Sequence, residues 1–512
     1  MPIDGDAITH GPWTAGTVYN RPPENLEEDE CTDTINVRIG QAGECEKRAG
    51  SANYKATRHT ISGSPDVMLV GQYRESSSSE PVFKAAGAVF WEYSLSAGGL
   101  AWNDRTGSQT ITPNKPFDAV GANGTLVLTN GTDPMLKWTG TGNNLAALGV
   151  SSRFSTAQRC AFWDNRLWMG NTNANADRLY YSDLAAIETW GATSFYNLGS
   201  DIIGLEPVSD SLAIHTSDGI HTLTPTGNAT IPYQLQQQTQ QAAVSGRSIV
   251  TVPGNRQFFV QKEGVYEWDG DREVKKASIA LDDGYWDHLK SSSLSNSFAV
   301  YYRLNNEIWF WLPYGLTQTN MNDVMVYNLE KERWHGPFRG QTAETYYERA
   351  CAAMIDDKPH AGDFLGELVD QDATVYTDVN GASTKAIHAQ FTTSAKAPEG
   401  EETRLKWLFS RNYFDSIGAF NVNLTQVSSG LSGVSQPITM VSSGFELNTD
   451  TLDNAALGSV RVQARDSELS GYDPHSSVTV SQNVSAEWFR FRKIVQVYKD
   501  LGIKRKTKAG VD

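Results

Sequence analysis

Short runs of alternating apolar and polar residues recur along the chain, and each is followed by a turn and by a second run that carries an aromatic residue. Period-2 alternation is typical of β-strands, and turns such as Asn130-Gly131, Asp218-Gly219 and Glu263-Gly264 suit tight hairpins. The predicted hairpins pair residues 125–129 with 136–138, 160–163 with 167–170, 212–215 with 219–223, 258–260 with 264–268 and 298–302 with 307–311, with further copies expected at 87–91 and at 364–368 with 374–376.

The spacing of these hairpins indicates a repeat architecture. Consecutive copies begin about 35 to 50 residues apart, close to the roughly 40–50 residues of a four-stranded propeller blade. One such blade cannot bury both of its faces, whereas blades stacked radially bury them and leave only short edges. The pattern therefore predicts an all-β protein with a β-propeller of six or seven blades over residues 51–384. A β-sandwich or a set of small β-domains is the alternative, which the regular spacing disfavours.

The flanking segments lack this repeat. Residues 1–50 are expected to form an N-terminal arm and an opening strand at 36–39, because Pro22, Pro23 and the acidic run 27–30 disfavour a helix. Residues 385–500 are expected to form an additional β-sandwich-like domain, or a closing blade with insertions, with 488–498 as a last strand pairing back. Its other strand-like runs lie at 387–391, 420–424, 459–463 and 477–480, and a basic tail follows at 501–512.

Composition narrows the choice of partners. The 512 residues carry 59 acidic and 43 basic side chains, a formal net charge of -16, so an overall basic footprint for nucleic acid is absent. This charge fits solubility or a surface that repels DNA. The start, MPIDGDAITHGPW, has neither the basic start nor the apolar core of a secretory signal, and no apolar run approaches the roughly 18 residues that span a bilayer. We therefore expect synthesis in a cytosol and no membrane insertion.

Candidate chemistry is sparse. The sequence has no G-x-S-x-G, H-E-x-x-H or Walker A motif, and none of the four cysteines stands at C-x-x-C spacing. Cys31 and Cys45 could form a bridge, although free thiols are the expectation. His215 and His221 on one predicted hairpin could share a metal only with further ligands, which the sequence does not offer. We therefore expect a protein that is not an enzyme and has no cofactor and no metal site.

Three acidic pairs could in principle supply the two carboxylates of a glycosidase. Each lies in a loop-like segment beside Gly or Lys, where Asp commonly stabilises a turn through its own side chain. Turn residues are therefore the simpler interpretation, and a propeller glycosidase or glycan-binding protein stays as an alternative function. The pairs are Asp269 with Asp271, Asp282 with Asp283, and Asp356 with Asp357.

Two polar segments are candidates for an interface or for the lining of a channel. One is rich in amides and nearly uncharged, which suits a loop that faces water in a channel without binding or repelling phosphate. An aggregation-prone strand, a spacer loop and an ordinary surface loop are the alternatives. The other is the basic tail, whose alternative is a solvated terminus. The candidate residues are Gln234, Gln236, Gln237, Gln238, Gln240, Gln241, Lys504, Arg505, Lys506 and Lys508.

Several local phrases together resemble the tail-nozzle and tail-stabilisation proteins of short-tailed (podovirus-type) bacteriophages. The resemblance covers roughly residues 35–335, its phrases are moderately specific only as a set, and the C-terminal third offers none. The phrases are NVRI (36–39) with GECEKRAG (43–50), DNRLWMG (164–170) with DRLYYSD (177–183), LGSDIIGL (198–205) leading to LAIH (212–215) and DGI (218–220), GVYEWDG (264–270), and VMVYNL (324–329) with RW (333–334).

This resemblance implies a structural protein of the virion tail that is assembled in the host cytoplasm. It implies a homo-oligomeric ring, usually six-fold, below the portal and an adaptor (head-to-tail connector) protein. The ring would retain the packaged genome, later conduct double-stranded DNA without binding it specifically, and hold tail fibres or spikes. An acidic lumen would suit this role, because tight phosphate contacts require Lys and Arg. A soluble propeller scaffold for another protein partner is a further alternative.

Overall fold

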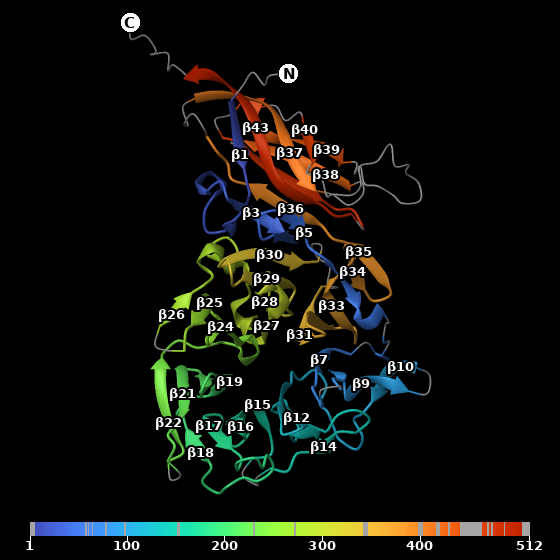
Figure 1. The fold of residues 1–512 in the computed structure, drawn as a ribbon, viewed down its shortest axis with the longest axis vertical. Helices are drawn as coiled ribbons and strands as arrows, with labels where there is room; N and C mark the ends of the chain where they lie inside the picture. The colour runs from blue at the N-terminus through green and yellow to red at the C-terminus, as the bar shows by residue number, and fades with distance from the viewer. Residues whose placement is uncertain are drawn as a thin grey trace.

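The computed structural model describes residues 6–503 except 57–58, 60, 64, 77–78, 97–98, 151–153, 229–230, 271–272, 341–346, 398–402, 416–419, 429–430, 441–462, 468–470, 473–474 and 486. The described part is built from strands, and its helices are short 3-10 turns. None of these helices has the length or apolar character required to cross a bilayer. Seven antiparallel four-stranded sheets form a wheel, and two larger sheets form a second lobe at its rim (Figure 1).

In the first four blades of the wheel, the four strands follow one another in sequence. The first strand of each blade lies at the hub and the fourth at the outer edge. Blade 1 contains β7 (Val67–Gln72), β8 (Val82–Ala86), β9 (Val89–Ser96) and β10 (Gly99–Asp104); blade 2, β11 (Asp118–Ala122), β12 (Thr125–Thr129), β13 (Leu136–Trp138) and β14 (Ala146–Ala147); blade 3, β15 (Ala157–Trp163), β16 (Arg166–Thr172), β17 (Arg178–Tyr181) and β18 (Phe195–Asn197); blade 4, β19 (Ile202–Val208), β20 (Ser211–Thr216), β21 (Gly219–Pro225) and β22 (Tyr233–Thr239).

Three further blades complete the wheel, and the last of them takes its outer strand from the N-terminal segment. Blade 5 contains β23 (Val250–Val252), β24 (Arg256–Gln261), β25 (Gly264–Trp268) and β26 (Val274–Lys276); blade 6, β27 (Phe298–Tyr302), β28 (Glu307–Leu312), β29 (Asp323–Asn328) and β30 (Arg333–Arg339); blade 7, β31 (Arg349–Ile355), β32 (Lys358–Asp363), β33 (Leu368–Ala373) and β6 (Gly50–Asn53). The connecting 3-10 turns are η2 (Tyr54–Ala56), η3 (Gly246–Ser248), η4 (Ile279–Leu281), η5 (Trp286–His288), η6 (Ser291–Asn296) and η7 (Arg303–Asn305).

Ring closure joins the last blade to the first. The thiol of Cys351 on β31 donates a hydrogen bond to the carbonyl oxygen of Val67 on β7, at 3.1 Å. Because β6 precedes blade 1 in sequence yet pairs with β33, the chain also fastens the two ends of the wheel through backbone hydrogen bonds. The all-β propeller prediction is confirmed, and the described residues contain seven blades.

Apolar side chains between neighbouring blades form the core of the wheel. The second strand of blade 6 is buried along its whole length, with Trp309 paired to Val300 on one side and Val326 on the other. Such a strand reads as a continuous apolar run because both of its faces are covered. Tight turns end the strands: Asp164 and Asn165 have φ of +50° and +53°, the left-handed conformation that Asn and Asp tolerate.

Two hairpin predictions are wrong in detail. Residues 364–367 form the turn before β33, which begins only at Leu368, because the carboxylate of Asp363 accepts the backbone N–H groups of Leu365 and Glu367 at 2.9 and 2.8 Å. Residues 374–376 lie beyond the end of β33. At 87–91 the strand begins only at Val89, since Gly87, at φ +60°, forms the turn after β8.

The second lobe is a β-sandwich made by both ends of the chain. One sheet has the order β2-β3-β36-β42-β38-β39, and the other β4-β5-β43-β37-β40, with β1 and β41 at its margins. Residues from both sheets share one apolar core around Trp13, Phe391 and Phe491. The strands are β1 (Asp6–His10), β2 (Gly16–Thr17), β3 (Glu30–Ile35), β4 (Val37–Ile39), β5 (Cys45–Lys47), β36 (Ala389–Thr393), β37 (Thr403–Asp415), β38 (Phe420–Ser428), β39 (Leu431–Met440), β40 (Gln463–Ser467), β41 (Gly471–Tyr472), β42 (Ser477–Gln482) and β43 (Arg490–Ile503), with the turn η1 (Pro23–Asn25).

The expected arm over residues 1–50 is therefore replaced by five strands of this sandwich. The predicted opening strand at 36–39 corresponds to β4, which pairs locally with β5. The irregular arm was wrong because β1, β3 and β5 are short and pair with β43 or β36, more than 350 residues away, and no local pattern marks such pairings. Strand β43 also pairs along β37, in line with the predicted final strand. Most of the predicted run 459–463 lies outside the described residues.

Polar side chains hold the sandwich against blades 6 and 7. Arg38 on β4 reaches Glu307 on β28 at 2.5 Å and Asp372 on β33 at 3.6 Å, so a single side chain ties the sandwich to both blades. Arg333 on β30 donates to the carbonyl oxygens of Thr14, Ile39 and Gly40, with atom separations of 2.9, 3.2 and 2.5 Å. The hairpin of β34 (Thr377–Asn380) and β35 (Ser383–Ala386) leads the chain from the wheel back to the sandwich.

Candidate functional site

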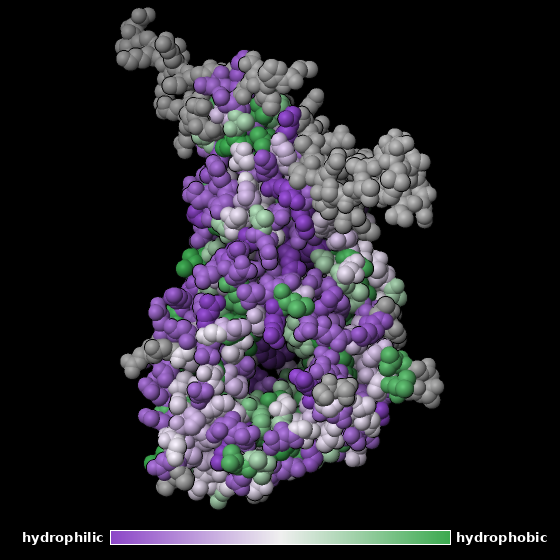
Figure 2. All heavy atoms as spheres, viewed as in Figure 1, coloured by the Kyte–Doolittle hydropathy of each residue, from purple (hydrophilic) through white to green (hydrophobic). Residues whose placement is uncertain are grey.

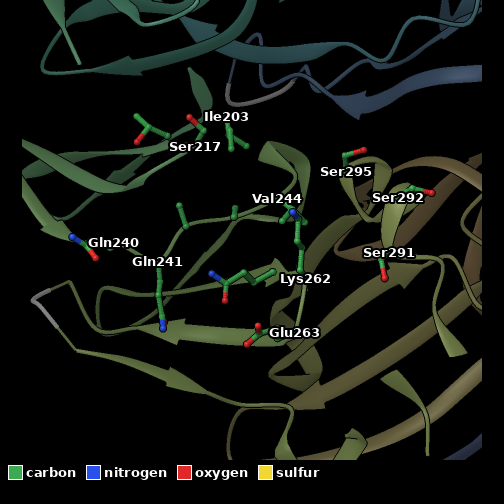
Figure 3. Close-up of a pocket in the computed structure, with 14 residues that line it drawn as sticks. Ile203, Ser217, Gln240, Gln241, Val244, Lys262, Glu263, Ser291, Ser292 and Ser295 are labelled. Atoms are coloured by element: carbon green, nitrogen blue, oxygen red, sulfur yellow. The ribbon is translucent and has the colours of Figure 1, made fainter. Parts of the chain in front are cut away.

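A large cleft lies between blades 4 and 5, on the face where outer strands connect to the next inner strands. Its volume is about 670 Å³. The β22–β23 linker supplies Gln240 and Gln241, and the β24–β25 turn supplies Lys262 and Glu263 across from them (Figure 3). We call this the polar cleft. Its other lining residues are Ile203, Thr216, Ser217, Ala242, Ala243, Val244, Gln261, Ser291, Ser292 and Ser295.

The chemistry of the polar cleft suits binding more than catalysis. Amides and hydroxyls dominate its lining, and Glu263 is the one carboxylate among the lining residues, whereas glycoside hydrolysis commonly uses two. His215 lies beneath the β22–β23 linker of the polar cleft and is fully buried. Its Nδ1 accepts the backbone N–H of Ala243, 3.2 Å away. Burial lowers the pKa of His215 to about 4, so this ring is neutral near pH 7 and stabilises the linker.

A second cleft, the acidic cleft, adjoins the first and shares Lys262, Glu263 and Ser291 with it. Its volume is about 440 Å³, and its lining includes Asp282, Asp283, Asp287 and Trp286. Of the predicted acidic pair, Asp282 forms an ion pair with Lys276 at 2.8 Å, and Asp283 has the turn conformation, φ +61°.

The other acidic pairs behave as turn residues where they are described. Asp356 and Asp357, with φ of +50° and +60°, form the two-residue turn between β31 and β32. Asp269 follows the end of β25, and Asp271 lies outside the described residues. No group of three or more His, Cys, Asp or Glu in the described part of the chain is arranged to hold a metal ion.

The hub of the wheel, the space enclosed by the inner strands, carries charged side chains. Figure 2 shows the wheel hollowed at its centre. Asp118 on β11 accepts the backbone N–H of Cys160 at 3.1 Å, and Glu206 on β19 accepts the hydroxyl of Thr251 at 3.4 Å. Burial, and then the charge of Asp118, raises the pKa of Glu206 to about 8. Arg159 on β15 lies beside Asp118, and burial lowers its pKa while Asp118 opposes that effect.

Arginine side chains also lie beside the inner strands of blades 6 and 7. Arg247 bridges these two blades, donating to the carbonyl oxygens of Ala350 and Asn296 at 2.9 and 3.0 Å. The cavity beside it has a volume of about 150 Å³ and is also lined by Arg349 and Met321. Acidic and basic side chains are thus both present around the inner strands.

The predicted glutamine segment is mostly a strand and lies away from the hub. Gln234, Gln236, Gln237 and Gln238 belong to β22, the outermost strand of blade 4, so for them the strand interpretation is confirmed and the loop interpretation is wrong. This strand, YQLQQQT, pairs with β21 on one side alone among the described residues. Only Gln240 and Gln241 lie in a loop, and they line the polar cleft. The tail candidates Lys504, Arg505, Lys506 and Lys508 lie outside the described residues.

The two histidines of the β20–β21 hairpin do not converge. His215 is paired with Ile220 and His221 with Ile214, so their side chains project from opposite faces of blade 4. Cys31 and Cys45 are free, buried thiols in the sandwich core, although they are close enough to influence each other. Burial raises the pKa of Cys45, which keeps it protonated.

Comparisons with known proteins give propellers at low identity. No protein-family model matches the chain, and no curated protein matches it. Among solved structures, YCF48 bound to a D1 peptide has 11% identity and a TM-score of 0.39 over 64% of this chain and 98% of that chain. The extracellular domain of the hybrid two component system BT3049 from B. thetaiotaomicron has 11% identity and a TM-score of 0.44 over 77% and 54%. YCF48 from Cyanidioschyzon merolae has 11% identity and a TM-score of 0.38 over 63% and 98%.

Sequence reasoning missed most of the cleft and all of the hub. Lys262 and Glu263 are ordinary turn residues in sequence, and only the approach of blades 4 and 5 places them opposite Gln240. For the hub a signal did exist: Asp118, Arg159 and Glu206 each stand in a run that otherwise reads as an inner strand. A charge inside such a strand indicates that this position faces a polar space and not an apolar core.

Proposed function

We propose that this chain is a structural subunit of a short-tailed phage tail, where copies form the nozzle ring below the adaptor, retain and then conduct double-stranded DNA, and hold fibres or spikes. The resemblance of residues 35–335 to that family motivates the proposal. Within the fold, the observation that supports it best is the junction between sandwich and wheel. A propeller that only presents a binding face does not need a second lobe held by buried ion pairs, whereas a load-bearing ring subunit does.

The first of the phrases that carry the resemblance, 36–39 with 43–50, falls at this junction. Asn36 has the left-handed conformation, φ +54°, and its side-chain amide donates to the carbonyl oxygens of Arg339 and His388 at 2.9 and 2.8 Å. Its carbonyl oxygen accepts from Arg48 and from the backbone N–H of Arg339, both at 2.8 Å. Lys47 donates to the carbonyl groups of Gln482 and Val484 at 3.1 and 3.0 Å. These residues hold the place where the chain passes from sandwich to wheel.

In the proposed nozzle, the DNA duplex would pass through the opening that the subunits of the ring enclose together. A ring of six such chains, each with a formal net charge of -16, is dominated by carboxylates, which attract phosphate much less than Lys and Arg do. An acidic lumen of this kind would let DNA slide.

Electron microscopy of the purified chain, alone and mixed with an adaptor ring of a short-tailed phage, tests the proposal. We expect rings of the chain seated on the adaptor, and no cleavage of bacterial surface glycans incubated with the protein. A chain that never joins the adaptor and that hydrolyses those glycans would contradict the nozzle role and favour the enzyme.

The joined clefts favour a second candidate, a propeller that binds an extended polar ligand such as a glycan. The polar and acidic clefts meet at Lys262, Glu263 and Ser291 and together offer hydroxyls, amides and carboxylates. Titration of glycan fragments against the wild type and against Glu263→Gln tests this candidate. Saturable binding that the substitution weakens would support it, and equal or absent binding would oppose it.

A further inference from the structure

The outer strands of the seven blades differ in how well they are protected. Strands β14, β18 and β26 have only two or three residues, so they offer little backbone for pairing. Strand β30 contacts the sandwich strands β2, β3 and β4, and β6 contacts β34. The remaining two, β10 with six residues and β22 with seven, end their sheets with no further strand in the described part of the chain. Long, uncovered edge strands are ready templates for pairing with another chain.

These two edges lie on opposite flanks of the wheel, to the right and left in Figure 1, with the sandwich at the top of the view. They belong to blades 1 and 4, so they cannot pair within one molecule. A chain with an unpaired edge strand on each flank can associate head to tail. The β10 flank of one copy then meets the β22 flank of the next copy. Contacts of this head-to-tail kind generate rings when the rotation closes.

Apart from Asp104 at the end of β10, both edges are uncharged in a strongly acidic protein. Residues 219–246, which include β21, β22 and the cleft linker, contain no Asp, Glu, Lys or Arg, and neither do residues 94–103 around the β9–β10 turn. Two copies with a net charge of -16 each repel one another over most of their surfaces. The two neutral flanks are surfaces at which copies can approach without that repulsion, which selects a second copy of this chain as the occupant.

Exposed aliphatic side chains mark the same two hairpins. Leu95 and Leu100 form a directly opposed pair on β9 and β10, and they are 77% and 65% exposed. Ile231 in the β21–β22 loop is 61% exposed. Contact with another molecule would remove the apolar surface of these side chains from water. The gain in free energy would be roughly 25 cal/mol per Å² of apolar surface buried.

From these observations we infer that β10 of one copy pairs edge to edge with β22 of the next copy, which joins blade 1 and blade 4 into one continuous sheet across the subunit boundary. Leu95 and Leu100 then pack beside the β21–β22 hairpin and Ile231. This inference rests on the proposed ring and supplies its lateral contact. A pairing of six residues buries a small area compared with the roughly 800 Å² that each partner buries in a stable interface. Assembly therefore depends on concentration and gains strength from closure of the ring.

Cross-linking of surface cysteines in the full-length chain tests the contact. The four native cysteines are buried, so Leu100→Cys and Gln236→Cys add accessible thiols on the two flanks. The double variant, treated with a short bismaleimide, should give a ladder of multiples of 56.2 kDa. Each single variant should keep the mass of one chain, because a head-to-tail contact never brings the same flank of two copies together. A double variant with no ladder, or ladders in the single variants, would overturn the inference.

Charged variants separate this contact from the ring itself. Leu100→Glu blocks one flank and Gln236→Glu blocks the other, since each places a carboxylate on an uncharged edge; both positions are exposed, so the fold is retained. We expect each variant alone to be monomeric by native mass spectrometry, and an equal mixture to form dimers but no rings, through the two intact flanks. If both variants form rings as the wild type does, the ring stands and this contact is wrong. If the wild type forms no species larger than one chain in solution or on the adaptor, the ring proposal and this contact both fail.

Discussion

The guanidinium of Arg48 and the carboxylate of Asp378 form a buried pair with two parallel hydrogen bonds, Nη1 to Oδ1 at 3.0 Å and Nη2 to Oδ2 at 2.5 Å. Their side chains are 2% and 0% exposed. Arg48 lies where the chain enters the wheel and Asp378 where the chain leaves it, so this pair ties the two crossings together. The ring of Tyr347, with its centroid 4.8 Å from the guanidinium carbon, covers the pair, and Ser51 donates to Asp378 at 3.1 Å.

Removing one partner of this pair should be costly. In Arg48→Met the carboxylate of Asp378 stays buried without its cation, and we expect a loss of about 3–5 kcal/mol in the free energy of unfolding, measured by urea denaturation. The exposed pair Lys55–Asp356, 2.9 Å apart, is the matched control, and Lys55→Met should cost less than about 1 kcal/mol. The double variant Arg48→Met with Asp378→Leu should recover part of the loss. Equal effects of the two single substitutions would contradict a buried, specific pair.

The sequence predicted the wheel much better than the sandwich, and the reason is the range of the contacts. A blade is made of neighbouring hairpins, so period-2 alternation and turns such as Asp164-Asn165 are local signals. The sandwich joins Ile8 to Gln496 and Cys31 to Thr393, and no local pattern records such pairings. For the candidate site, Gln240 and Gln241 were found through their composition alone, because the cleft arises from the spacing of two blades.

Close packing at Gly16 gives a second prediction. This residue on β2 has φ of +91°, and a Cβ added there would lie 2.7 Å from the carbonyl oxygen of Trp334 on β30. We expect Gly16→Ala to destabilise the protein by more than the conformational strain alone, which is about 1 kcal/mol or more. Gly124→Ala is the control, because Gly124 has φ of +73° with nothing within 4 Å of an added Cβ. The difference in melting temperature between the two variants measures the steric contact, and equal melting temperatures would exclude it.

The raised pKa of Glu206 predicts the direction of a pH effect. Burial beside Asp118 raises it from 4.5 to about 8, so between these values the folded state binds a proton that the unfolded state has lost. This contribution to stability is therefore present below about pH 4.5 and is lost as the pH rises through 8. Glu206→Gln should be more stable than the wild type at pH 8 to 9, with a smaller gap near pH 5, measured by urea denaturation across this range. A gap that widens toward acid would show the opposite sign.

His215 predicts an effect in the other direction. Because burial lowers its pKa from 6.5 to about 4, the folded state resists protonation, and stability falls as the pH drops from 6.5 through 4. A protonated ring would also lose the hydrogen bond that Nδ1 accepts from the N–H of Ala243. We expect His215→Gln, whose amide oxygen is an acceptor, to lose less stability than the wild type between pH 7 and pH 4.5. Parallel acid profiles for the two proteins would remove His215 as a cause.

The N-terminal strands predict that truncation is severe, which an irregular arm would not. A variant that starts at Arg48 keeps β6 but removes β1–β5, and with them Trp13 and Val37 from the sandwich core. A variant that starts at Tyr54 also removes β6 and leaves β33 as an open edge of blade 7. We expect the first variant to expose apolar sandwich surface, seen as binding of a hydrophobic dye, while thermal unfolding of the wheel remains cooperative. The second should lose that cooperative transition as well, because its wheel is no longer fastened. Wild-type dye binding and melting in both variants would return residues 6–47 to the role of a dispensable arm.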